Sequence, residues 1–362
     1  MSKQHELVQF SRGASGGGSK NLLINGAMVL DQRNSASAVT PSDGNYTLDR
    51  FHVDASAASK FSVQQVTDAP TGFSNSLKVT SLSAYTPSSS DFLDIQQPIE
   101  GFNSAQLNLG TANAKVMTLS FYVKSSLTGT FGGAFSNSAY NRSYPFTYTI
   151  SAANTWERKT ITLTGDTSGT WIGSTNGIGL RVVWSVGAGS GRINTAGAWV
   201  GSLALGATGQ TNVVATNAAT WQITGCQIEV NDNATDFEHE NYGTTLAKCQ
   251  RYYYAHIQSG NATQYVGMGE MYTTTQLDLN VHFPVSMRAS PTLVQSSGTN
   301  YWRGYGGNGS ILVSNNWNLW LSNSTNTVVS HYVTANSSTT AGFGMRIIND
   351  STSAALAYDA EL

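Results

Sequence analysis

Short runs in which apolar and polar residues alternate follow one another along most of the chain. In the segment VMTLSFYVK, Met117, Leu119 and Phe121 fall on one face of an extended backbone. A period of two places one face of a strand in a core and the other in water. Turn signals such as SDGN, GDTSG and STNG separate the runs. The pattern therefore predicts many short antiparallel strands arranged as sandwiches or barrels.

The predicted strands form two groups along the chain. The first group comprises residues 22–24, 50–53, 60–66, 76–81, 92–95, 116–124, 146–150, 157–164, 178–184 and 219–229. The second group comprises residues 251–256, 265–272, 275–285, 291–295, 311–314, 317–322, 327–333, 342–348 and 356–361. The stretch 187–217, rich in Gly, Ala, Ser and Thr, is predicted to be a long loop.

The segment YGTTLAKCQRYYY at residues 242–254 interrupts the alternation. Leu246 and Cys249 are spaced like one face of a helix, and Thr244 or Thr245 could cap it. A helix of about two turns is therefore predicted as a joint between two β units.

The expected fold is all-β. Its parts are an attachment arm with a Gly/Ser linker (1–20), a large jelly-roll-like β-sandwich (21–241), the helical joint (242–254) and a smaller C-terminal antiparallel β-sandwich (255–362).

Composition supports this fold class and narrows the partners. Charged residues make up 11% of the chain, too few for long amphipathic helices with a charged face. The net charge of −2 offers no basic surface for nucleic acid. No apolar run approaches the ~20 residues that span a bilayer, so membrane insertion is not expected. MSKQHELVQF at the start lacks the apolar core of a signal peptide, which favours assembly in a host cytoplasm.

No motif of a known catalytic class is found, so the chain is predicted not to be an enzyme and to need no cofactor. His52 and His282 read as ordinary strand residues. Cys226 and Cys249 are interpreted as buried thiols, and a disulfide between them is left open. A carboxylate pair brought together by the fold to cleave glycosides remains a minor alternative.

The segment YWRGYGGNGS carries the main candidate site. Tyr301, Trp302 and Tyr305 offer ring faces on which a sugar could stack, and Arg303 could donate to its hydroxyl or acidic groups. The surrounding glycines suggest a loop over residues 300–310. The competing interpretation makes Trp302 a packing residue or a subunit contact. In the following NNWNLWLSN, at least one tryptophan is expected in the core.

Two weaker candidates lie elsewhere. Asp232 and Asp236 could contribute carboxylates to a structural calcium site, or could belong to a solvated loop. In the arm, Leu7, Val8 and Phe10 form a short apolar patch that could attach the chain to another protein. The alternative is a plain terminal tail.

The segments NLLINGAMVLDQRN and DGNYTLDRFHVD resemble the carbohydrate-binding-module-like domain of phage tail-fibre and appendage proteins. NSLKVTSLSAY, TLSFYVKSSLTGTFGGAF, NRSYPFTYTISAANTWERKTITLTGDTSGTW and TGCQIEVNDNATDFEHENYGTTLAKCQRYYY follow in the expected order, so the resemblance spans about residues 21–254. The ends FPVSMRASPTL and ALAYDAEL are similar to the terminal domains of such fibres. The resemblance implies a virion surface protein, commonly trimeric, that binds host glycans, and it supplies no catalytic residues.

Three functions follow in order of preference. The first is a receptor-binding fibre that recognises host surface carbohydrate. The second is a structural head fibre or capsid decoration protein without glycan specificity, and the third is a polysaccharide depolymerase. A homotrimer is expected from the low charge and the many Tyr and Trp residues. The arm is shorter than in many such fibres, which leaves attachment to tail or capsid open.

Overall fold

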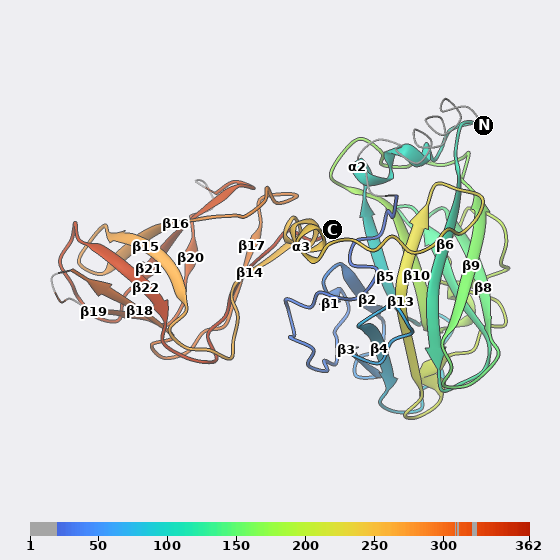
Figure 1. Cartoon of the computed structure of the whole chain (residues 1–362), viewed down its shortest axis with the longest axis horizontal. Coiled ribbons are helices and arrows are strands. Elements are labelled where there is room, and N and C mark those ends of the chain that lie inside the picture. Colours follow the sequence, from blue (N-terminus) through green and yellow to red (C-terminus); the bar gives the residue numbers. More distant parts are fainter. Residues whose placement is uncertain (1–19, 308, 310, 321–323) are drawn as a thin grey trace, which may run out of the picture.

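A computed structural model describes residues 20–307, 309, 311–320 and 324–362 and shows an almost entirely β protein. Two β units lie one after the other along the long axis of the molecule, with one helix between them (Figure 1). The predicted fold class, a jelly-roll-like sandwich followed by a smaller antiparallel one, is confirmed. Within the described ranges, no helix has the length and apolar character needed to cross a membrane. Leu7, Val8 and Phe10 lie outside the described residues, so their attachment role stays a prediction.

The first unit packs two antiparallel sheets face to face. The six-stranded sheet has the order β1 (Asn45–Leu48), β2 (Phe51–Ala55), β5 (Phe92–Glu100), β10 (Ile178–Ala188), β7 (Gly129–Ser136) and β8 (Ser143–Ile150). The five-stranded sheet has the order β3 (Phe61–Val66), β4 (Ser76–Ser81), β13 (Thr220–Glu229), β6 (Val116–Ser125) and β9 (Glu157–Thr164). Two short helices, α2 (Gly101–Ser104) and η1 (Ala105–Leu107), follow β5.

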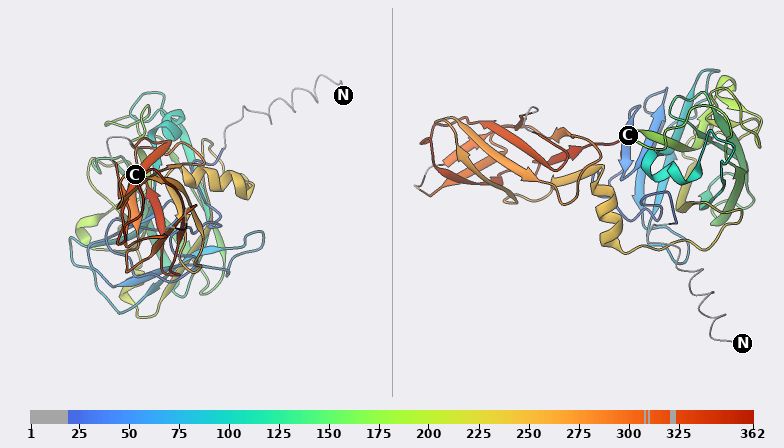
Figure 2. Two further views of the ribbon diagram at one scale, coloured as in Figure 1. Left: turned by 90° about the vertical axis from the view of Figure 1, so that its left-hand side faces the viewer. Right: turned by 90° about the horizontal axis from the view of Figure 1, so that it is seen from above.

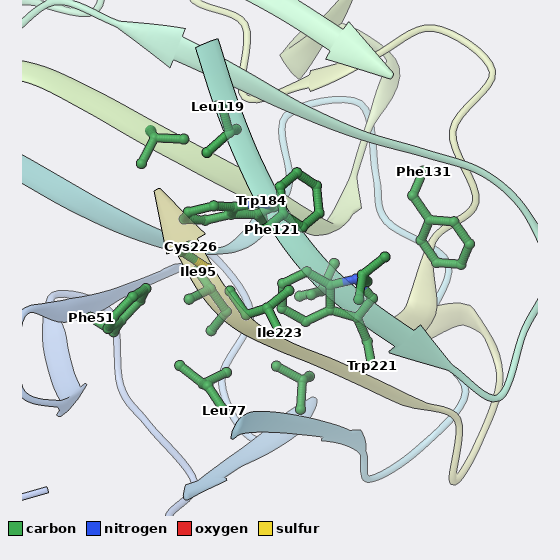
Figure 3. Close-up of a cluster of buried hydrophobic side chains, with 14 of the residues drawn as sticks. Phe51, Leu77, Ile95, Leu119, Phe121, Phe131, Trp184, Trp221, Ile223 and Cys226 are labelled. Atoms are coloured by element: carbon green, nitrogen blue, oxygen red, sulfur yellow. The ribbon is translucent and has the colours of Figure 1, made fainter. Parts of the chain in front are cut away.

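Large side chains from both sheets fill the space between them (Figure 3). Phe121 from β6 meets Trp184 from β10 edge to face, with 5.8 Å between ring centroids and 82° between ring planes. Both residues are fully buried, and so is Trp221 from β13. Aromatic residues of this size each bury about 150–250 Å², so they dominate the stability of the sandwich. Cys226 is a free buried thiol within this core, as interpreted from the sequence.

The stretch 187–217 is more ordered than the predicted loop. It contains two short 3₁₀ helices, η2 (Ser190–Arg192) and η3 (Val213–Ala215), and a parallel pair formed by β11 (Ile193–Asn194) and β12 (Gly206–Ala207). β12 passes so close to β7 that a Cβ atom on Gly132 would lie 2.8 Å from the backbone nitrogen of Ala207. β7 therefore needs its glycines. Their low strand propensity explains why the sequence pattern did not reveal this strand.

The sequence-based prediction also fails in two places at the start of the unit. The strand expected at residues 22–24 is an irregular, bent segment. Asn25 and Met28 nearby have positive φ angles, which break an extended backbone. β1 was not predicted at all.

Helix α3 (Tyr242–Gln250) lies between the units and confirms the predicted helical segment. Its N-cap residue is Asn241, which makes no side-chain capping bond, so the predicted caps Thr244 and Thr245 are wrong. Both threonines fall inside the first turn. Cys249 on this helix is a second free buried thiol. Neither cysteine forms a disulfide.

The second unit packs a three-stranded sheet against a seven-stranded one. The smaller sheet has the order β14 (Tyr253–Ile257), β23 (Leu356–Asp359) and β17 (Thr292–Gln295). The larger sheet has the order β19 (Ile311–Ser314), β18 (Trp302–Gly306), β22 (Gly344–Asn349), β15 (Tyr265–Met271), β16 (Gln276–His282), β21 (Val328–Thr334) and β20 (Asn318–Leu319).

Charged residues join the two units where the chain's last residues meet the first sandwich (Figure 2). Arg50, which is buried, pairs with Glu361, and its guanidinium lies 3.6 Å from the ring centroid of Tyr252. Arg251, the residue after helix α3, donates a hydrogen bond of 2.6 Å to Glu100 at the end of β5. Buried ion pairs demand good geometry and strongly penalise loss of one partner. These contacts fix how the second unit projects from the first.

Candidate functional site

The predicted recognition loop is a strand in the structure. Trp302 begins β18 and is fully buried, and it packs edge to face against the equally buried Trp317 with 5.4 Å between ring centroids. Its indole therefore cannot stack on a ligand, and the expectation of a loop-tip residue is wrong. Tyr301 is half-buried and packs against the core of the second unit. The packing interpretation of Trp302 is the one that the structure supports.

Alternation along β18 places Arg303 and Tyr305 on the opposite side from Trp302. Arg303 forms an ion pair with Asp350, and its Nη1 lies 3.4 Å from the Tyr305 hydroxyl. Two of the four predicted residues thus lie on the side of the seven-stranded sheet that faces away from the core. Their role in ligand binding stays a prediction.

This side of the seven-stranded sheet, called the outer face below, carries an unusual set of side chains. Val, Leu and Met residues point inward from β15, β16 and β21, and the alternate positions point out. The outward residues on the central strands are Met268, Glu270, Asp278, Asn280, Ser330 and Tyr332. Most of these side chains are polar, and Met268 and Tyr332 add apolar surface to them.

A hollow of about 640 Å³ lies over β15, β16 and β21 on the outer face. It is lined by Met268, Glu270, Tyr272, Asp278, Trp320 and Ser330, among others. Tyr272 is 70% exposed and Trp320 is 39% exposed. The Trp320 ring also rests against Tyr332, with 4.9 Å between centroids. Aromatic side chains grouped at the rim of a hollow are typical of binding sites.

Hydrogen-bonding groups form the floor of the hollow. Glu270 and Asp278 are directly opposite each other on neighbouring strands, and Asp278 is in turn opposite Tyr332. The Ser330 hydroxyl donates to the Asn280 side-chain oxygen at 2.7 Å. Sugar rings offer apolar faces to aromatic rings and hydroxyl groups to carboxylates and amides. The hollow provides both kinds of contact side by side.

The two predicted metal ligands, Asp232 and Asp236, do not lie in a cluster of metal-binding side chains among the described residues. Asp232 and Asp236 are exposed, and Asp232 accepts a hydrogen bond of 2.6 Å from its neighbour Asn233. In the part of the chain that the structure describes, no group of three or more His, Cys, Asp or Glu side chains is placed to hold a metal ion. The structural calcium stays a prediction, without a ligand set in these residues.

A buried carboxyl group with a strongly raised pKa lies on the first unit. Asp94 on β5 is fully buried, and neither of its carboxyl oxygens has a hydrogen-bond partner among the described residues. Burial raises its pKa well above the usual value, and the nearby Asp54 and Asp43 raise it further. Asp94 falls within the strand predicted over residues 92–95, and nothing in the sequence marks its side chain as buried. Full burial excludes direct contact with a ligand and makes Asp94 a structural group.

Comparison with known proteins adds little to this picture. No protein-family model and no curated protein matches the chain. Among solved structures, the enzymatically active domain of tailspike protein 4 from bacteriophage CBA120 is similar at 12% identity over 59% of this chain and 22% of that chain, with a TM-score of 0.32. A CBM4 structure is similar at 15% identity over 59% of this chain and 100% of that chain, with a TM-score of 0.29.

The CBM22-1 xylan-binding domain from Paenibacillus barcinonensis Xyn10C is also similar, at 9% identity over 61% of this chain and all of that one, with a TM-score of 0.26. Scores this low carry no argument about function. The chemistry of the site has to be argued from the residues of this chain.

Proposed function

We propose that the protein is a surface fibre of a bacteriophage particle that binds host surface glycans through the outer face of its second unit, without cleaving them. The resemblance of residues 21–254 to phage appendage domains supports the virion role. The observation that carries the glycan role is the hollow lined by Tyr272 and by Trp320, whose ring rests against Tyr332.

Large, partly apolar side chains that stay exposed on the outer face cost the protein free energy. Tyr272 and Met268 are 70% and 75% exposed, although burial of such side chains is worth about 1.5–3 kcal/mol. A ligand that covers them recovers part of that free energy. The carboxylates and amides beside the rings favour a hydroxyl-rich ligand over a purely apolar one.

The proposed assembly is a homotrimer attached to tail or capsid proteins through its N-terminal arm. One shallow sugar site binds weakly, because sugars are well hydrated in water. Several copies on one particle gain about 10²–10⁴ in avidity without any new contact. Trimerisation would therefore turn a modest site into a stable attachment.

The alternative is a head fibre or capsid decoration protein without glycan specificity. In that case the exposed Met268, Tyr272 and Trp320 would be covered by another virion subunit. The two functions make opposite predictions for cells. Only the first requires the hollow to remain open on the finished particle.

The test is Trp320→Ala in the full chain, carried on phage particles. Adsorption to host cells is expected to weaken about tenfold or more, which corresponds to roughly 1.4 kcal/mol. Melting should change little, because the ring is partly exposed. Tyr242→Ala, which removes a 61% exposed ring from α3, is the matched control and should adsorb normally. Normal adsorption by well-folded Trp320→Ala particles would reject the glycan role of this face.

A further inference from the structure

Arg346 stands between two aromatic rings on the outer face, opposite Met268 at the near edge of the hollow. It lies on β22 between β15 and β18. Its guanidinium carbon is 5.5 Å from the ring centroid of Tyr265 on β15 and 5.2 Å from that of Tyr305 on β18. Rings on both sides attract the cation and limit the conformations of its side chain. The guanidinium is therefore oriented before any ligand arrives.

Arg346 differs from its neighbour Arg303 in having no charged partner. Arg303 is paired with Asp350. Among the described residues, the Arg346 side chain makes no hydrogen bond and no ion pair, and it is exposed. A guanidinium carries five N–H donors in a planar fork that matches a carboxylate or a phosphate. These donors are available to an anion in solution.

The hollow has the opposite charge. Glu270 and Asp278 face each other across β15 and β16, and neither forms an ion pair with a described residue. Two like charges directly opposite each other on adjacent strands are destabilising. The outer face thus carries an unpaired cation at Arg346 on β22 and, beginning on the neighbouring strand β15, a pair of carboxylates in the hollow. An acidic ligand is drawn to the first and repelled from the second.

The order of strands in the sheet sets the distance between Arg346 and Trp320, which lines the far side of the hollow. Arg346 is opposite Tyr305 on one side and opposite Met268 on the other. Asn280 and Ser330 are opposite each other further along, and the Trp320 amide bonds to the Ser330 carbonyl. Four strand spacings separate β22 from β20, or about 19 Å at about 4.8 Å each. A glycan that contacts both Arg346 and Trp320 must therefore be an oligosaccharide.

We propose that the ligand is an acidic oligosaccharide and that Arg346 is its anion-binding subsite. A carboxylate or phosphate group of the glycan binds the guanidinium between Tyr265 and Tyr305. An uncharged sugar several units away stacks on Trp320 in the hollow. This inference rests on the proposed function, and it adds the charge and the direction of the bound chain.

The test uses the full-length protein and the purified surface polysaccharide of the host, immobilised in three forms. The first form is intact, the second has its carboxylates reduced to alcohols, and the third has its phosphates removed. Wild-type protein should bind the intact form at least about tenfold more tightly than the form that lacks the relevant acid. That difference should shrink as salt is raised, because screening weakens the exposed contact.

Arg346→Met keeps the apolar stem and removes the charge, so it should bind all three forms with the weaker affinity. Arg346→Lys should be intermediate, because a lysine keeps the charge but loses the fork. Lys115→Met, an exposed position on the first unit, removes the same charge elsewhere and should behave as wild type.

The outcomes separate the inference from the proposed function. Equal wild-type affinity for all three forms, or an unchanged preference in Arg346→Met, would overturn the acidic subsite and leave glycan binding intact. Absence of binding to every form would overturn both. If wild-type protein binds the carboxylate-reduced polysaccharide more weakly, the group that Arg346 recognises is a carboxylate. If it binds the phosphate-free polysaccharide more weakly, the group is a phosphate.

Discussion

The outward side of the six-stranded sheet in the first unit and the outer face of the second unit are both solvent-facing sides of large antiparallel sheets. They differ in whether their polar and aromatic side chains have partners within the chain. On the six-stranded sheet, the Tyr140 hydroxyl lies 3.2 Å from the Asp54 carboxylate and 3.3 Å from the Gln96 side-chain oxygen. Arg181 covers the Tyr140 ring at 4.2 Å from its centroid. The first unit thus uses its own polar and aromatic groups to cover one another.

On the seven-stranded sheet, corresponding groups are left open. Tyr272 and Trp320 are exposed, and Arg346 has aromatic neighbours but no anion. Groups that satisfy one another contribute to stability, whereas groups without partners are available to a ligand. The comparison therefore separates a face that supports the fold from one that is suited to recognition.

Trp302→Ala should produce the largest effect, and it should act on stability alone. Trp302 lies on the inner side of the same sheet and is fully buried against Trp317. Truncation of a buried Trp to Ala costs about 3–5 kcal/mol through lost burial and a residual cavity. Thermal or denaturant unfolding of the second unit should show this loss.

Adsorption measured per folded molecule should stay at the wild-type level in Trp302→Ala. A normal melting temperature combined with weak adsorption would instead place Trp302 in the binding site. In that case the division between inner and outer faces would fail.

Asp94→Asn should have a smaller effect, and its sign depends on pH. Because burial raises the pKa of folded Asp94, the folded chain binds the proton more tightly than the unfolded chain, whose value is about 3.9. The stabilising contribution of the protonated form is complete below that value and is lost as pH rises through the folded pKa. Asn resembles the protonated carboxyl and does not titrate.

Melting curves from pH 3.5 to pH 8 should therefore show Asp94→Asn gaining on wild type as pH rises, by at most about 1.4 kcal/mol per pH unit. Adsorption should not change, because Asp94 is buried in a face that the chain itself completes. A stability difference independent of pH would mean that folding does not shift the pKa of Asp94. Loss of adsorption would move the recognition face to the first unit.

Strands with clear alternation were predictable from the sequence. Three of them have the bounds that the pattern predicted: β4 (Ser76–Ser81), β9 (Glu157–Thr164) and β19 (Ile311–Ser314). β18 was missed, since its glycines indicate a loop until β22 and β19 are known to pair with it. Local propensity loses to tertiary pairing at such positions.

The site was less predictable than the fold. Tyr272 and Trp320 are far apart in the sequence and meet only through the order of strands in the sheet. Alternation shows that neighbouring side chains point to opposite faces, but it does not show which face is covered. The sequence therefore pointed to Trp302 for recognition and gave no sign that Trp320 is the exposed ring. Among the four predicted residues, Arg303 and Tyr305 reach the outer face.

Hydroxyl-radical footprinting of the full chain, with and without the purified surface polysaccharide of the host, tests the central claim most directly. Met268, Tyr272 and Trp320 are exposed and reactive, and binding at the hollow should protect all three. Phe102 and Tyr242, exposed outside the second unit's sheet, should react equally in both samples. Protection confined to the first unit, or unchanged reactivity of the three residues at saturating polysaccharide, would contradict recognition by the outer face.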